Sequence, residues 1–440
     1  MAARHLLAAA TVALVLDRPC SVTGAAAKIV SLLAAVDLTP RQLFLDTEQI
    51  SASAGVELRL HRPYEEQGFA MQYDEPWENL RSFGYNSVLD NGTHVLLYYM
   101  IKSTWPLSPA ECAAAGTLGC VNGWYTNAYT CVAISSDGTS FAKPALGLVE
   151  INRSTANNCI WPPGRPGHLA AKHEPGTVFI DERPGGVPAD QKFKMIATWG
   201  GGPAGAPADG TYTFASSDGL RWRPLAQRPA SGVSGTQHVA FWDPNHGVYV
   251  DYRRSYSDYT VHQPWNWNAT CAVCVEPHRC GLAHAGARQV GRCTSDDFIT
   301  YPNCSFLGRP GQFGPQRVNN RTSIVFSFDR DDAPCLDVYT NQVYLLPGSQ
   351  HYLMFPSFFE HFPGPPSNPS ENDGLWSEVR LAHSRDGLNW TYVGGDRQAW
   401  LRRGPQRSPP DGGMEPTAGS SWDSGMIAAV RGVVQLAIGR

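Results

Sequence analysis

The sequence predicts an all-β protein, a β-propeller of about five blades, and three observations lead to that prediction. Glycine and proline are plentiful, at 43 and 34 residues, and the 440 residues include 13 Trp, 17 Tyr and 17 Phe. Many turns and many aromatic residues favour short strands over long helices. A Ser-Asp-Gly turn pattern also recurs along the chain, and three strand-like runs precede each copy. Such repetition indicates a repeat architecture.

The recurring turn combines Ser, Asp and usually Gly with an aromatic residue a few positions later. The Asp carboxylate can cap turn amides, Gly permits a positive φ, and the aromatic ring folds back over the turn. The pattern resembles the Asp-box of propeller proteins, so we expect these aspartates to shape turns rather than to catalyse. The four copies are Ser136-Asp137-Gly138 with Phe141, Ser217-Asp218-Gly219 with Trp222, Ser295-Asp296-Asp297 with Tyr301, and Ser384-Arg385-Asp386-Gly387 with Trp390.

Three strand-like runs, the turn and a fourth strand together have the pattern of one propeller blade. The runs are 86–89, 94–101 and 130–135 in the first unit, 176–180, 192–198 and 211–216 in the second, 238–242, 247–253 and 288–293 in the third, and 341–346, 351–358 and 378–383 in the fourth. A fifth unit begins at Asp423 and has only the runs 427–430 and 433–438.

The propeller is predicted to occupy residues 40–440. The outer strands of the last blade could come from the N-terminal segment 41–62, which has strand-like runs at 43–45 and 56–61. Closing the ring in this way would remove two free sheet edges. The alternative is a truncated chain with an open ring.

The N-terminus has the features of an export signal, assigned to residues 1–27. Arg4 and His5 precede an apolar run at 6–16, and small residues follow as far as 25–27. This order matches a signal peptide, and the run is too short to cross a bilayer. The alternative is an uncleaved apolar tail. We expect a secreted, extracellular protein with no transmembrane segment.

The cysteines agree with export. Removing Cys20 with the signal would leave ten of the eleven cysteines, an even number suited to five disulfides. Zinc is the alternative for Cys271 and Cys274, which lie near His278, Cys280 and His284. A Pro- and Trp-rich insertion in an exported chain favours a disulfide-stapled loop. Six glycosylation sequons also agree with export, at Asn91, Asn152, Asn268, Asn303, Asn320 and Asn389.

Charge and motifs exclude several functions. The net charge is −4, 17% of residues are charged and no basic stripe is present, so we expect no nucleic-acid partner. The sequence has no Gly-x-Ser-x-Gly elbow, Walker loop or His-Glu-x-x-His motif. Sialidases share Asp-boxes, but they need an arginine cluster and usually six blades, and no matching arginine pattern occurs here. We expect a monomer.

A series of short motifs runs along the chain: Leu-Phe-Leu-Asp at 43–46, Glu-Pro-Trp-Glu at 75–78, Val-Phe-Ile-Asp at 178–181, Gln-His-Val-Ala-Phe-Trp-Asp at 237–243, Tyr-Thr-Asn at 339–341, Ser-Arg-Asp-Gly at 384–387 and Asp-Ser-Gly at 423–425. Their order resembles a large group of secreted propellers that are similar to glycoside hydrolase families 32 and 43. The resemblance spans about residues 40–440. It implies the fold and a carbohydrate ligand, but one fold hosts many functions.

The resemblance also implies where a site would lie. Those families place an Asp, an Asp and a Glu at the innermost strand starts of their first three blades, and a glycosidase needs two carboxyl groups flanking the scissile bond. This sequence departs from that triad. The first innermost strand begins at Asn86, with Glu78 the nearest acid upstream; Glu174 precedes the second; the third begins at Gln237-His238, where the acid is absent.

The fourth innermost strand offers Asn341 and the fifth Asp423. We therefore expect Glu78, Glu174 and Asp423 to supply the catalytic carboxyl groups. The expected substrate-binding residues are Trp77, Gln237, His238, Asn341 and Arg253. No metal or other cofactor is required, although a cation could bind among the acids.

Each of these residues has a plainer interpretation. The acids could be solvated or could cap turns, His238 could be a satisfied core histidine, and Arg253 could be a solvated strand-end arginine. Trp77 and the pair Trp265 and Trp267 could pack at edges instead of stacking on sugars. Asp46 and Asp181, at strand ends, are interpreted as turn formers. Because the family acids are missing, a non-catalytic carbohydrate-binding propeller is the main rival to a glycosidase.

Overall fold

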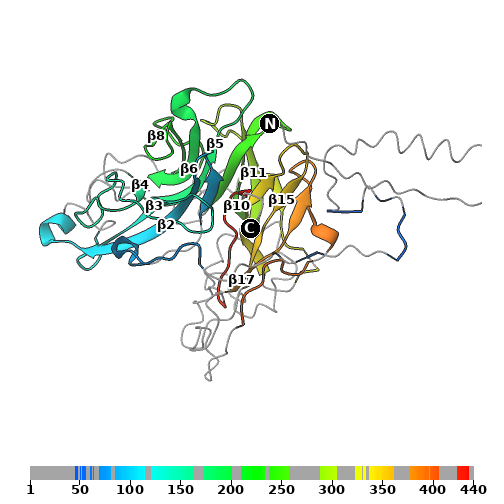
Figure 1. The fold of residues 1–440 in the computed structure, drawn as a ribbon, viewed down its shortest axis with the longest axis horizontal. Helices are drawn as coiled ribbons and strands as arrows, with labels where there is room; N and C mark the ends of the chain where they lie inside the picture. The colour runs from blue at the N-terminus through cyan, green and yellow to red at the C-terminus, as the bar shows by residue number, and fades with distance from the viewer. Residues whose placement is uncertain are drawn as a thin grey trace, which may run out of the picture. The chain divides into compact units, whose positions relative to one another are not determined.

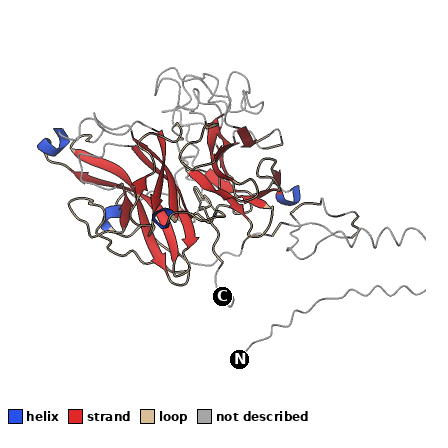
Figure 2. Cartoon of the chain, turned by 90° about the horizontal axis from the view of Figure 1, so that it is seen from above, coloured by secondary structure: helices blue, strands red, loops and turns tan. Residues whose placement is uncertain are grey.

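The computed structural model describes residues 45–47, 50, 52–55, 60–61, 63, 69–80, 85–113, 120–162, 172–200, 210–232, 237–256, 288–304, 323–329, 331–332, 336–360, 376–395, 397–405 and 424–435. All of them belong to one compact unit, Leu45–Arg440. This part of the chain is nearly all β, and its helices are short turns (Figure 2). No helix among these residues is long and apolar enough to cross a membrane.

Three antiparallel sheets each take four strands in chain order, and their colours in Figure 1 run from blue through green to yellow. Sheet I contains β1 (Ser87–Asp90), β2 (Val95–Pro106), β3 (Trp124–Ser135) and β4 (Cys159–Trp161). Sheet II contains β5 (Lys172–Ile180), β6 (Phe193–Gly200), β7 (Gly210–Ser216) and β8 (Arg223–Pro224). Sheet III contains β9 (His238–Asp243), β10 (Val248–Tyr256), β11 (Arg288–Ser295) and β12 (Ser323–Phe326).

A fourth set of strands, here called sheet IV, is interrupted part-way along its length. One part has the order β13 (Leu336–Thr340), β16 (Ser357–Glu360) and β17 (Trp376–Val379). The other has the order β14 (Val343–Leu345), β15 (Tyr352–Met354), β18 (Ala382–Ser384) and β19 (Thr391–Tyr392). Gln342 and Phe355 exchange backbone hydrogen bonds of 3.3 and 2.8 Å, so the interruption is a bend between the two parts.

The predicted runs of the first four units agree with the sheets in place and order, but several strands are longer than predicted. In the fifth unit, the run 427–430 and the described residues 433–435 of the run 433–438 form no strand. β2 and β3 pair from Val95 opposite Ser135 out to Pro106 opposite Trp124. The prediction stopped at residue 101 because residues 102–104 are all polar and a proline follows at position 106. A two-stranded ladder tolerates such residues where one face is exposed.

The third strand of each sheet ends in the Ser–Asp turn. In sheet II, Ser216 Oγ accepts from the N–H of Gly219 at 2.9 Å, and Asp218 Oδ1 accepts from the N–H groups of Leu220 and Arg221 at 2.8 Å each. Equivalent bonds occur at Asp137, Asp297 and Asp386. In sheet III the capping residue is therefore Asp297, not its neighbour Asp296.

Tyrosine hydroxyls join neighbouring sheets. Tyr98 of sheet I donates to the carbonyl of Gly219 in the sheet II turn at 3.1 Å. Tyr249 of sheet III donates to Asp181 at the end of β5 at 2.6 Å, and Tyr352 of sheet IV donates to Asp243 of sheet III at 2.7 Å. Sheets I to IV thus contact one another in chain order, and buried side chains fill the spaces between them.

Two terminal segments contact these sheets. Residues 424–435 form isolated parallel bridges, Met426 with Ser377 of sheet IV and Arg431 with Ser87 of sheet I. Near the N-terminus, Asp46 pairs with Arg385 at 3.1 Å, and the Leu45 carbonyl accepts from the N–H of Gly394 at 3.2 Å. Ring closure by residues 41–62 stays a prediction.

Three disulfides lie within the described ranges: Cys112–Cys120, Cys131–Cys159 and Cys293–Cys304. The remaining predicted disulfide cysteines, Cys271, Cys274, Cys280 and Cys335, lie outside those ranges, and so does the zinc alternative.

Candidate functional site

The first strands of the four sheets begin at equivalent positions, which the register defines. In sheets I and II the serine that bonds the turn is one position before the predicted one, Ser135 and Ser216. The second-strand residues opposite the four turn serines, Ser135, Ser216, Ser295 and Ser384, are Val95, Phe193, Tyr249 and Tyr352. The residue three positions further along each second strand pairs with a residue of the first strand. These first-strand residues are Ser87, Thr177, Val239 and Gln342. The residues immediately before these are Asn86, Gly176, His238 and Asn341. None of the four has a carboxyl group.

Direct contacts bring three of these strand starts together. The Gln237 amide nitrogen donates to the Asn86 carbonyl at 3.0 Å, although the two residues belong to sheets III and I. Thr177 Oγ1 donates to the His238 carbonyl. A Cβ on Gly176 would lie 1.9 Å from the Ile196 carbonyl oxygen and 3.2 Å from His238 Cβ. Only glycine therefore allows the backbone of β5 to lie this close to Ile196 and His238.

The start of sheet IV carries buried polar groups that have no hydrogen-bond partner in the part of the chain that the structure describes. Asn341 is 3% exposed and its Oδ1 is unpaired; both ends of the Gln342 amide are unpaired at 2% exposure. The hydroxyls of Thr340 and Ser357, on paired strands, are also buried and unpaired. Each unsatisfied buried group costs about 1–3 kcal/mol, so these groups are suited to bonding a polar ligand.

His238 and Arg253 belong to a buried charged cluster. His238 Nδ1 lies 3.0 Å from Asp251 Oδ2, and Arg253 Nε donates to the same oxygen at 2.8 Å. Burial alone would raise the pKa of Asp251, but the charges of Arg253 and His238 hold that pKa below its usual value. The guanidinium of Arg253 also donates to Ser231 at 2.9 Å. Arg253 is only 2% exposed, and its ion pair with Asp251 compensates its charge.

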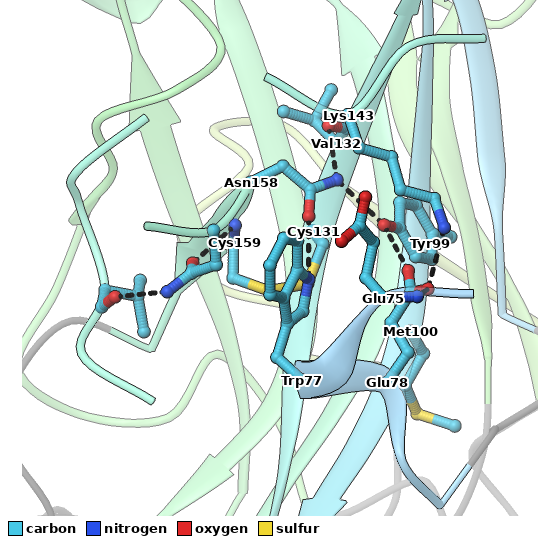
Figure 3. Close-up of a disulfide and its surroundings, with 12 residues drawn as sticks. Glu75, Trp77, Glu78, Tyr99, Met100, Cys131, Val132, Lys143, Asn158 and Cys159 are labelled. Carbon is cyan, nitrogen blue, oxygen red and sulfur yellow. Dashed lines mark hydrogen bonds and ion pairs between the residues drawn. A yellow bond between two sulfur atoms is a disulfide. The ribbon is translucent and has the colours of Figure 1, made fainter. Parts of the chain in front are cut away.

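Trp77 and Glu78 lie in η1 (Pro76–Glu78), which packs on β2. Figure 3 shows both side chains turned toward sheet I, beside the Cys131–Cys159 disulfide. Glu78 accepts from the Tyr99 hydroxyl at 2.7 Å and from Lys143 Nζ at 2.7 Å, and its side chain is fully buried. Its other contact, 3.0 Å to the N–H of Glu75, caps the turn.

An amide side chain connects Trp77 to the same network. Asn158 Oδ1 accepts from Trp77 Nε1 at 3.0 Å, and Asn158 Nδ2 donates to Tyr99 Oη at 2.7 Å. Figure 3 shows this continuous path from the indole through Asn158 and Tyr99 to Glu78 and Lys143. The network fixes η1 to sheet I through hydrogen bonds and a buried ion pair.

Of the other two predicted acids, the structure describes only the backbone of Glu174 and does not describe Asp423. The sequence placed Glu174 before the second innermost strand, but β5 begins at Lys172, so the backbone of Glu174 lies within the strand, opposite Thr198. Asp423 lies outside the described residues. Its neighbour Ser424 is 1% exposed, and its hydroxyl has no partner among the described residues. Asp181 accepts from Tyr249 and from the N–H of Arg183, which fits its interpretation as a turn residue.

Sequence reasoning missed several residues here. Asp251 was not considered, although it lies two positions before Arg253 on a strand and so shares its face. Gln342 was missed because the fourth inner strand start was identified only by Asn341. The sequence drew attention to Asn86 only because no acid stands there. In the structure its carbonyl accepts two hydrogen bonds, from the Gln237 amide and from the N–H of Arg431, at 3.0 Å each.

Comparisons with known proteins give only distant likenesses. No family model and no curated protein matches the chain. Among solved structures, an N-acetylgalactosamine deacetylase from F. plautii in complex with blood group B trisaccharide shares 17% identity over 84% of this chain and 80% of its own, with a TM-score of 0.43. A glycoside hydrolase shares 14% identity over 73% and 75%, with a TM-score of 0.39. A thermostable family-43 glycoside hydrolase shares 13% over 73% and 74%, with a TM-score of 0.36. TM-scores this low assign neither a fold nor an activity.

Proposed function

We propose that this chain is a secreted five-bladed β-propeller that binds a glycan where the inner strands of its blades begin. In this proposal residues 1–27 are the signal peptide, residues 40–440 form the propeller, and the Ser–Asp turns are Asp-boxes. The observation that carries the glycan site is the group of carboxamides at the inner strand starts: Asn86, Gln237, Asn341 and Gln342, of which the last two have unpaired polar atoms.

Carboxamides suit sugar recognition because each offers both donors and an acceptor. A sugar hydroxyl also donates one hydrogen bond and accepts others, so an amide can bond two hydroxyls at once. The register-equivalent positions carry no charge that would have to be desolvated, except within the compensated His238–Asp251–Arg253 cluster. Binding of a polar, uncharged part of a glycan is therefore the best-supported function of these strand starts.

Hydrolysis is the second candidate, and the placement of Glu174 favours it. Glu174 precedes the inner start of sheet II on the backbone, and Asp423 adjoins Ser424. Together they would supply the acid and the base or nucleophile that a glycosidase needs. Glu78 is less suited to that work, because Lys143, Tyr99 and the Glu75 amide occupy its carboxylate. Neither candidate requires a metal or another cofactor.

The test of the binding site is an oligosaccharide array probed with the mature protein and with Asn341→Ala and Gln342→Ala. We expect each variant to lose binding by about tenfold or more, because each removes groups available only to the ligand. Gln72→Ala, an exposed amide away from the inner strands, is the matched control and should bind as the wild type does. Unchanged binding in all three variants would contradict the proposed site.

The test of hydrolysis uses Glu174→Gln and Asp423→Asn on whichever glycans bind. Turnover by the wild type that is lost in either variant while binding persists would establish a glycosidase. Binding without turnover in the wild type would leave the carbohydrate-binding function and remove the catalytic one.

A further inference from the structure

We propose that an oxyanion, of the carboxylate or phosphate class, binds to Arg431 beside the carboxamides at the inner strand starts. Arg431 lies in the C-terminal segment that runs parallel to β1. Its N–H donates to the Asn86 carbonyl at 3.0 Å, and its carbonyl accepts from the N–H of Val88 at 2.7 Å. The backbone of this arginine is therefore fixed against the inner strand of sheet I.

The side chain of Arg431 reaches a second sheet and meets no acid among the residues that the structure describes. One guanidinium nitrogen donates to the Val178 carbonyl of β5 at 3.3 Å, and the group lies 5.9 Å from the centre of the Phe179 ring. A guanidinium has five N–H donors. Within the described residues this single bond is its only hydrogen bond, and it forms no ion pair.

Arginines that lie deeper in these sheets pair with acids, whereas Arg431 pairs with none among the described residues. Arg253 pairs with Asp251, Arg288 with Asp337 at 3.1 Å, and Arg380 with Asp332. Arg431 is half-buried, so its guanidinium loses part of its hydration, and a bound counter-ion would replace that loss. Burial lowers the pKa of Arg431 to about 10, opposed by Tyr344, which agrees with a cation that lacks a carboxylate neighbour.

In this proposal the partner of Arg431 is an anion that reaches the group from solution. The Arg431 residue is partly exposed, so a solute has access to it. The planar guanidinium matches a carboxylate or a phosphate through two parallel hydrogen bonds. The Asn86 carbonyl that holds Arg431 also accepts from Gln237, so an anion here would lie next to the proposed glycan site. Its source is either an acidic sugar of the bound glycan, which rests on the proposed function, or a free inorganic anion.

The experiment measures the melting temperature and ligand affinity of the mature protein with inorganic phosphate, with a uronic-acid oligosaccharide and with its neutral counterpart, at matched ionic strength. The variants are Arg431→Gln and Arg431→Lys, and the control is Arg402→Gln, which removes an exposed arginine. We expect phosphate or the uronate to raise the melting temperature of the wild type and of the control. Affinity should fall about tenfold or more in Arg431→Gln and less in Arg431→Lys.

Each outcome decides the proposal. Without added anion, Arg431→Gln should melt no lower than the wild type, because the substitution removes an uncompensated charge. Stabilisation by the uronate but not by phosphate would identify the glycan as the source; stabilisation by phosphate alone would identify a free anion. Equal stabilisation of wild type and Arg431→Gln, or none of either, would overturn the anion site.

If Arg431→Gln does not fold, the loss of affinity in Arg431→Lys decides alone. Neutral glycan binding that survives in Arg431→Gln but not in Asn341→Ala keeps this proposal separate from the proposed function.

Discussion

The hydroxyl of Tyr98 and the carbonyl of Gly219 form a 3.1 Å hydrogen bond that joins sheet I to the turn of sheet II. The same bond joins sheets III and IV, where Tyr252 donates to Gly387 at 2.9 Å. Between sheets II and III, the position equivalent to the tyrosine is Ile196. The position equivalent to the glycine is then Phe298, which keeps a positive φ of 61°.

There is a steric reason why Phe298 can replace the turn glycine where Ile196 replaces the tyrosine. A Cβ on Gly219 would lie 2.5 Å from the Tyr98 hydroxyl, and one on Gly387 would lie 2.6 Å from that of Tyr252. Isoleucine has no hydroxyl, so a side chain is possible at the third turn, where Phe298 packs 5.4 Å from Phe179, ring centre to ring centre. The turn residue and the facing second-strand residue are therefore coupled across each sheet interface.

The first prediction tests this coupling. Gly219→Ala should destabilise the fold by about 2–4 kcal/mol, since it adds a steric clash to the cost of about 1 kcal/mol for a positive φ. Gly247→Ala is the control, because Gly247 has a similar φ of 66° and nothing within 4 Å of its Cβ position. Gly247→Ala should lower the free energy of unfolding only by the cost of about 1 kcal/mol for a positive φ.

Tyr98→Phe completes the measurement by removing the hydroxyl. We expect Tyr98→Phe with Gly219→Ala to be less destabilised than the sum of the single variants, as seen in urea unfolding, because the clash involves the deleted oxygen. Strict additivity would contradict the coupling.

The second prediction concerns acid stability. Burial alone would raise the pKa of Asp386, but the N–H groups of Asn389 and Leu388 and the side chains of Asn389 and Ser384 lower that pKa to about 2. A depressed pKa means that the carboxylate stabilises the fold above its ordinary value of 3.8 and that this contribution disappears as the pH falls through about 2. The wild type should lose stability over this window.

Asp386→Asn should show a smaller loss over the same window, because its side chain no longer titrates. The measurement is the melting temperature from pH 5 to pH 2, the range set by the shift. Asp331→Asn, on an exposed acid outside the repeated turns, is the control. Identical acid profiles for the wild type and Asp386→Asn would contradict the assigned role of this turn.

The third prediction assigns Glu78 to the structure of sheet I. Glu78→Gln would leave the ammonium group of Lys143, whose side chain is 7% exposed, with only the exposed Asp74 as an acid partner. Breaking a buried pair in this way costs about 3 kcal/mol. Chemical unfolding should show that loss, and glycan binding by the folded fraction should stay unchanged.

Lys143→Met in the same chain should restore part of the stability, since it removes the unpaired charge. If Glu78→Gln instead unfolded like the wild type but abolished turnover, Glu78 would be a catalytic residue, as the sequence first suggested.

The sequence predicted much of the fold because the repeated turn depends on local chemistry. Ser, Asp and Gly form the turn with residues only a few positions apart, so a one-dimensional pattern reveals it. The third copy has two adjacent aspartates, Asp296 and Asp297, and only the structure identifies Asp297 as the capping residue. That copy departs from the pattern because Phe298 replaces glycine, and the reason lies on another sheet, at Ile196.

The candidate site was harder to predict because its partners are distant in sequence. Glu78 was expected to face a ligand, yet its carboxylate meets Lys143, and no local pattern connects the two. Arg253 was expected to contact a substrate, but Asp251 on the same strand face compensates its charge. Gln237 contacts Asn86 across two sheets. Only the register of the assembled strands reveals such pairs.

The last prediction concerns which sequons carry glycans when the protein is produced in a eukaryotic secretory pathway. Asn152 is exposed, and its amide nitrogen, like that of Asn91, has no hydrogen-bond partner among the described residues. Asn303 differs: its Nδ2 donates to Thr294 Oγ1 at 3.1 Å, its Oδ1 accepts from the N–H of Thr294 at 3.0 Å, and the next residue, Cys304, forms a disulfide.

A glycan on Asn303 would have to replace a hydrogen on the nitrogen that donates to Thr294, beside a disulfide that fixes the loop. We therefore expect high occupancy at Asn91 and Asn152 and low occupancy at Asn303, measured by enzymatic deglycosylation in heavy-oxygen water and mass spectrometry. Thr294→Val, which removes the hydroxyl acceptor, should raise occupancy at Asn303 while leaving Asn152 unchanged as the internal control. Full occupancy of Asn303 in folded wild-type protein would show that its hydrogen bonds to Thr294 do not protect it, and the proposed selectivity would fail.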